Sequence, residues 1–140
     1  MILNCNFEEL QALRSGAGLV LSGAPLGMAS ARYPAAGRGD VERLVPLLDG
    51  SISVRNLVEL ESISGAVSLI ASTLRHRLEA TVLEYHPAHE EAVTLYFEHA
   101  HVLVALDRLE RMGDEMRGLI ELMTGDSPTA DSAGSVSFPD

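Results

Sequence analysis

The strongest constraint on the fold is the spacing of residues between Pro87 and Gly125. Within this stretch, a seam of residues recurs in alternating steps of four and three: Leu95, His99, Val102, Leu106, Leu109, Gly113, Met116, Ile120 and Met123. Such spacing is typical of a helix that packs lengthwise on another helix. The stretch therefore predicts one long helix in an all-α fold.

The first half of this predicted helix is also apolar on its other faces. Between Ala92 and Leu106, further apolar residues lie outside the seam: Val93, Tyr96, Phe97, Ala100, Leu103, Val104 and Ala105. A helix that is apolar all round is expected to be buried all round. We therefore expect this segment to lie inside a bundle or in a subunit interface. The interface residues that we predict are Leu95, Tyr96, Phe97, Leu103 and Val104.

A second long helix is predicted from Ser53 to Glu84. Its apolar stripe has nearly the same spacing: Leu57, Leu60, Ile63, Val67, Ile70, Leu74, Leu78 and Thr81. Pro87 disfavours helical geometry at His86 and suits the first position of the next helix. The two helices are therefore expected to form an antiparallel hairpin with a very short link.

The length of these two arms predicts self-association. At about 1.5 Å per residue, each arm is roughly 45–55 Å long, whereas a compact domain of this size is about 30 Å across. The shorter helices that precede the arms are too short to cover both of them. We therefore expect a homo-oligomer, either a dimer that completes the bundle or a larger assembly.

The chain before the hairpin is predicted to hold short helices. Asn6 and Glu9 have the spacing of a capping box, which predicts a helix from Phe7 to Leu21. A Gly- and Pro-rich loop is expected over residues 22–39. Asp40 is then suited to cap a short helix from Val41 to Leu48.

One helical domain is therefore expected over residues 1–125. Residues 126–140 are polar and predict a largely flexible tail.

The composition limits the kinds of partner. The formal net charge is −10 at pH 7. An acidic surface repels the phosphate backbone of nucleic acids and the headgroups of anionic membranes, so we expect neither as a partner. The charge is compatible with a basic protein partner, or with a role in solubility alone.

The single cysteine, Cys5, excludes an internal disulfide and a cysteine metal cluster. The N-terminal segment MILNCNFEEL lacks the basic region of a signal peptide. No apolar run approaches the roughly 18 uncharged residues of a spanning helix. These features predict a cytoplasmic protein.

Side chains that commonly bind metals gather near the predicted hairpin tip and the start of the long helix. The set comprises Glu84, His86, His89, Glu90, Glu91, Glu98, His99 and His101. Residues three apart share a helix face, so Glu98 and His101 are placed to hold one metal ion, with Glu91 two turns before them. We therefore predict Glu98, His101, Glu91 and His99 as metal ligands, and His86, His89 and Glu90 as an alternative cluster. The alternative for His99 is a core histidine, since it lies on the seam.

The Glu98-x-x-His101 motif resembles the ligand motif of ferritin-like di-iron carboxylate proteins. Small encapsulated ferritins in that group also use a helical hairpin that completes its site by dimerising. The resemblance implies iron, or zinc or manganese, held by Glu98 and His101. Full-length members have two such motifs and two further Glu residues, whereas this chain has one motif, so a dimer would have to supply the second.

Three functional hypotheses remain from the sequence. The first is a non-enzymatic, self-associating helical scaffold, adaptor or regulatory interaction protein with no cofactor. The second is a small metal-binding or oxidoreductase bundle that uses Glu98 and His101. The third is an acidic partner, of the antitoxin or immunity type, that neutralises a basic protein.

Overall fold

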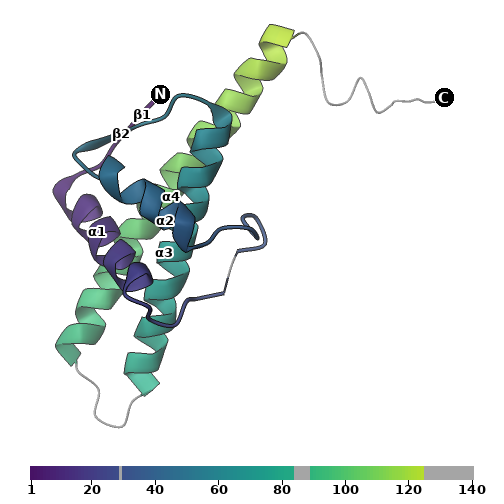
Figure 1. The fold of residues 1–140 in the computed structure, drawn as a ribbon. Helices are drawn as coiled ribbons and strands as arrows, with labels where there is room; N and C mark the ends of the chain where they lie inside the picture. Colours follow the sequence, from purple (N-terminus) through teal and green to yellow (C-terminus); the bar gives the residue numbers. More distant parts are fainter. Residues whose placement is uncertain (29, 84–88, 125–140) are drawn as a thin grey trace.

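The computed structural model describes residues 1–28, 30–83 and 89–124, and these are mostly helical (Figure 1). The described helices are α1 (Phe7–Leu21), α2 (Arg38–Leu44), α3 (Leu57–Leu83) and α4 (His89–Thr124), and a single 3₁₀ turn, η1 (Val45–Leu47), follows α2. Two short strands, β1 (Ile2–Asn4) and β2 (Ser51–Ser53), pair antiparallel with Leu3 opposite Ile52. The predicted all-α class is confirmed at this coarse level. The predicted tail over residues 126–140 lies outside the described residues.

The long helices α3 and α4 lie side by side and run in opposite directions (Figure 1). Ion pairs link them at two levels. Arg77, late in α3, contacts Glu91, early in α4, at 3.1 Å, and Arg117, late in α4, contacts Glu61, early in α3, at 3.3 Å. The predicted link at residues 84–88 lies outside the described part of the chain.

The core lies between α3 and α4 and beneath α1 and α2. Its largest fully buried side chains are Leu13, Leu44, Ile52, Leu60, Ile70, Leu74, Leu109, Val20, Val41, Val54, Val67 and Val102. On α4 the predicted seam is buried or half-buried as far as Met116. Beyond it, Ile120 and Met123 are 45% and 84% exposed, because α4 continues past the elements that cover it (Figure 1).

The first helix has the predicted bounds, Phe7–Leu21, and the predicted capping box. The Asn6 side chain accepts a hydrogen bond from the Glu9 N–H at 2.8 Å, and the Glu9 carboxylate accepts one from the Asn6 N–H at 3.0 Å. Gly16 allows α1 to approach α3, since a Cβ at this position would overlap the Ile70 side chain.

Two predicted helix starts are displaced. The second helix begins at Arg38 rather than Val41, and Asp40 accepts the Gly37 N–H at 2.9 Å from inside the first turn. The third begins at Leu57 rather than Ser53, because residues 51–53 pair with β1. Asn56 supplies the cap there, accepting the Glu59 N–H at 2.8 Å.

Helix α3 is long and apolar enough, by length and composition alone, to cross a membrane, contrary to the expectation from uncharged runs. In the structure, 67% of its most apolar window is buried against the rest of the chain. A core helix of a soluble protein meets the same criteria, so this is weak evidence for a membrane span.

Candidate functional site

The surface of α4 that faces away from the core is apolar. A helix turns by about 100° per residue, so Val93, Phe97, Ala100 and Val104 share one face, and Tyr96 and Leu103 border it. We call these six residues the outer face of α4. Its five large side chains are substantially exposed: Val93 54%, Tyr96 60%, Phe97 57%, Leu103 44% and Val104 50%. The face lies opposite the buried seam of the same helix.

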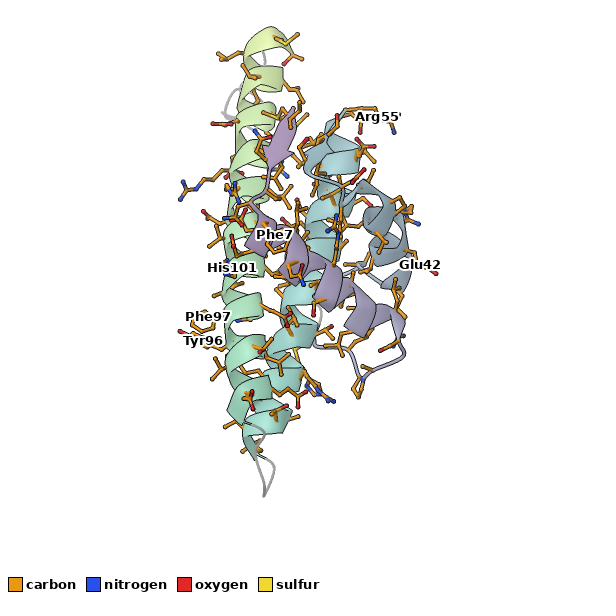
Figure 2. All side chains as sticks on the ribbon, turned by 90° about the vertical axis from the view of Figure 1, so that its left-hand side faces the viewer. Phe7, Glu42, Arg55, Tyr96, Phe97 and His101 are labelled. Carbon is orange, nitrogen blue, oxygen red and sulfur yellow. The ribbon has the colours of Figure 1, made fainter. Side chains whose placement is uncertain are left out.

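The outer face carries an aromatic pair. The rings of Tyr96 and Phe97 meet edge to face, with centroids 5.6 Å apart and planes at 77°. Figure 2 shows both side chains extending from α4 on the side away from α1 and α2. Large aromatic side chains in water are costly, and contiguous exposed apolar patches on soluble proteins commonly mark interaction sites.

Four of the five predicted interface residues lie on this face, and the fifth does not. Leu95 is 7% exposed and packs in the core of its own chain. It belongs to the seam, about 100° around the helix from Tyr96. The described part of this chain does not bury Phe97 and Val104 as expected. They are 57% and 50% exposed.

Charged side chains flank the outer face at both ends. Glu90, at the N-terminal end, is exposed. Arg111, two turns after Val104, is also exposed and its Nε lies 3.1 Å from the Asp107 carboxylate. Between Val93 and Val104, the only formally charged residue is Glu98, which is half-buried on the flank.

The four predicted metal ligands do not converge. Glu91 faces α3 and pairs with Arg77, and His99 projects about 200° around the helix from His101. Glu98 and His101 share a half-buried flank, and Figure 2 shows His101 on α4 between the levels of Phe97 and Phe7. The described part of the chain contains no group of three or more His, Cys, Asp or Glu residues that could hold a metal ion.

The alternative cluster is placed only in part. His86 lies outside the described residues, as does the side chain of His89. Glu90 is described, and it is exposed at the start of α4.

His99 lies in a groove that the sequence did not reveal. The groove has a volume of about 630 Å³ and is lined by three segments: residues 27, 28 and 30 of the loop before α2, the second half of α3, and the stretch from His99 to Leu106 on α4. Burial lowers the pKa of His99, the nearby Arg75 lowers it further, and Glu79 opposes them. His99 is therefore the half-buried seam residue that the spacing indicated, with a preference for the neutral form.

No local sequence motif predicts this groove, because the residues that line it are up to about eighty positions apart in the chain. The outer face, by contrast, was visible as apolar residues outside the seam. Comparisons of the chain with protein-family models, with curated proteins and with solved structures found no significant match.

Proposed function

We propose that this protein is a non-enzymatic helical scaffold or regulatory interaction protein that self-associates through the outer face of α4. In this proposal α3 and α4 form a hairpin, and a second copy completes the bundle. The observation that carries the proposal is the row of five large apolar side chains, each 44–60% exposed, on one continuous helix face.

Burying this face in a pair gives a free-energy gain of the same size as the cost of association. Full burial of a large apolar side chain contributes roughly 1.5–3 kcal/mol, so covering the exposed half of five such side chains contributes about 4–7 kcal/mol per copy. In a symmetric pair both copies bury the same patch, which doubles the gain. Association itself costs an estimated 4–15 kcal/mol, which is similar to this gain, so we expect the dimer to dissociate as the protein concentration falls.

A second copy fits the face better than a basic partner does. The net charge of −10 is carried outside the outer face, whose centre has no exposed charged side chain. A basic protein would be attracted to the rest of the surface and would leave the apolar row uncovered. An identical apolar row is the complement that this face requires.

Sedimentation equilibrium over a range of protein concentrations up to about 100 μM tests the proposal. The wild-type chain is expected to sediment as a dimer at the higher concentrations. Phe97→Lys is expected to give a monomer, because it places a charge in the middle of the buried patch.

The matched control is Val58→Lys, since Val58 is 77% exposed on α3 and lies outside the outer face. This variant is expected to dimerise like the wild type. A wild-type chain that stays monomeric throughout the range, or a Phe97→Lys variant that dimerises as tightly as the control, refutes the proposal.

A further inference from the structure

We infer that the two copies pack with their α4 helices antiparallel, around a twofold axis that passes beside Ala100. This inference rests on the proposed self-association and adds to it the orientation of the partner and the pairing of residues. It follows from two independent properties of the outer face, the order of side-chain sizes and the order of charges.

The order of side-chain sizes favours the antiparallel arrangement. About a centre next to Ala100, Phe97 and Val104 are equivalent positions on one side of the face, and Tyr96 and Leu103 are equivalent positions on the other. An antiparallel pair therefore places each aromatic ring against an aliphatic side chain of the second copy. All such layers then have a similar thickness, and the small Ala100 lies where the helices come closest.

A parallel pair lacks this match. It places Phe97 and Tyr96 of both copies at one level, and Leu103 and Val104 of both copies two turns later. The first layer is then thick and the second thin, so straight helices cannot fill both without a void or a clash. Either defect destabilises the pair.

The order of charges favours the same orientation. Glu90 and Arg111 lie about 10 residues on either side of the centre, which is about 16 Å in each direction along the helix. In the antiparallel pair Glu90 of one copy reaches Arg111 of the other, and this contact occurs twice. In the parallel pair Glu90 lies level with the second Glu90, and Arg111 with the second Arg111, so neither has an opposite charge at its level. Rim charges of this kind contribute mainly to orientation.

Cross-linking between engineered thiols distinguishes the orientations. In a Cys5→Ser background, which removes the native thiol, two variants are made, Val93→Cys and Asp107→Cys. In the antiparallel pair these two positions face each other across the interface, whereas the two copies of either position are about 21 Å apart along the axis. A thiol-reactive cross-linker shorter than that distance joins only facing positions.

The expected result is a cross-linked dimer from the mixture of the two variants and essentially none from either variant alone. Efficient cross-linking of each variant by itself overturns the inference in favour of a parallel pair. Ala100→Cys serves as the positive control, since it lies at the centre and is expected to cross-link alone in either orientation.

Sedimentation of the same samples separates the two claims. If the wild-type chain is a monomer, the proposed function fails, and the inference fails with it. If the samples are dimeric but neither the mixture nor the Ala100→Cys variant cross-links, the interface is elsewhere and the inference is wrong. If they are dimeric and only Ala100→Cys cross-links, the face is correct but the pairing of Val93 with Asp107 is wrong.

Discussion

Arg108 of α4 donates a hydrogen bond to the carboxylate of Glu9 in α1. The Glu9 side chain is only 6% exposed, and it also accepts the Asn6 N–H of the capping box. A second nitrogen of Arg108 donates to the Asn4 carbonyl at 2.6 Å. One guanidinium therefore neutralises a buried carboxylate and attaches the cap of α1 to α4.

Arg108→Ala is expected to lower the free energy of unfolding by about 2–4 kcal/mol, because it leaves the Glu9 carboxylate buried and unpaired. Urea unfolding followed by circular dichroism measures this. The control is Arg43→Ala on α2, whose side chain is 69% exposed and should contribute less than about 0.5 kcal/mol. Equal losses in the two variants would show that the Glu9 contact has no special role.

Two glycines in α1 are expected to respond oppositely to alanine. A Cβ at Gly16 would overlap Ile70 and crowd Leu74, so Gly16→Ala should destabilise the protein by about 1–3 kcal/mol. A Cβ at Gly18 has no neighbour within 4 Å, so Gly18→Ala should stabilise it by about 0.5–1 kcal/mol through helix propensity. Thermal unfolding of both variants tests the close approach of α1 to α3, which would be contradicted if both variants were stabilised.

Protonation of His99 is expected to weaken the fold at mildly acidic pH. Burial and Arg75 lower the pKa of His99 in the folded state, so the unfolded chain binds the proton more readily. The stability that depends on neutral His99 is therefore complete above the ordinary histidine pKa of about 6.5 and is lost as the pH falls below it. The measurement is urea unfolding at pH 7.5 and pH 5.5.

His99→Gln is the matched comparison, because the amide retains hydrogen-bonding capacity and does not titrate. The difference in unfolding free energy between pH 7.5 and pH 5.5 should be smaller in this variant than in the wild type. His76, Arg75 and Glu79 line the same groove and are unchanged in the variant. An identical pH dependence in the two proteins would show that His99 does not contribute.

A charge reversal at the end of the outer face tests the antiparallel pairing independently of cross-linking. Arg111→Glu should weaken dimerisation about 3- to 10-fold, because it places two like charges at each end of the pair. Adding Glu90→Arg to the same chain should restore the affinity. In a parallel pair the second substitution would not restore the affinity. Sedimentation of the double variant therefore distinguishes the antiparallel from the parallel pair.

The metal-binding alternative makes a separate prediction. The proposed ligands Glu98, His101, Glu91 and His99 do not form a common group, so iron, zinc or manganese should not raise the melting temperature of an untagged chain. A rise that is abolished by Glu98→Gln together with His101→Gln would instead support a site at this pair.

Local signals in the sequence were sufficient for α1 and for most of the helical seams. The Asn6–Glu9 capping box involves residues three apart, so its pattern specifies its own structure. Ser53 was assigned to the start of a helix because its partner strand lies about fifty residues away, and pairing at that distance leaves no local pattern.

For the candidate site too, the sequence predicted the features that depend on local spacing and missed those that depend on distant parts of the chain. The outer face follows from helical periodicity, which shows which residues lie opposite the seam. Periodicity alone did not show that Leu95 belongs to the core and that Phe97 is exposed, since that depends on where α3 packs. The groove beside His99 depends on the path of the loop before α2, which is rich in Gly, Pro and Ala.

The last turns of α4 extend past the other helices, and Leu119, Leu122 and Met123 are 54%, 80% and 84% exposed there. Among the described residues, few pack against these turns, so little tertiary packing delays their local opening. Hydrogen–deuterium exchange should therefore run from the C-terminal end of α4 inward, reaching the amides around Val102 and Leu109 only when the whole molecule opens. Within the single helix α4, we therefore expect the amides at the C-terminal end to exchange fastest and those around Val102 and Leu109 to exchange slowest.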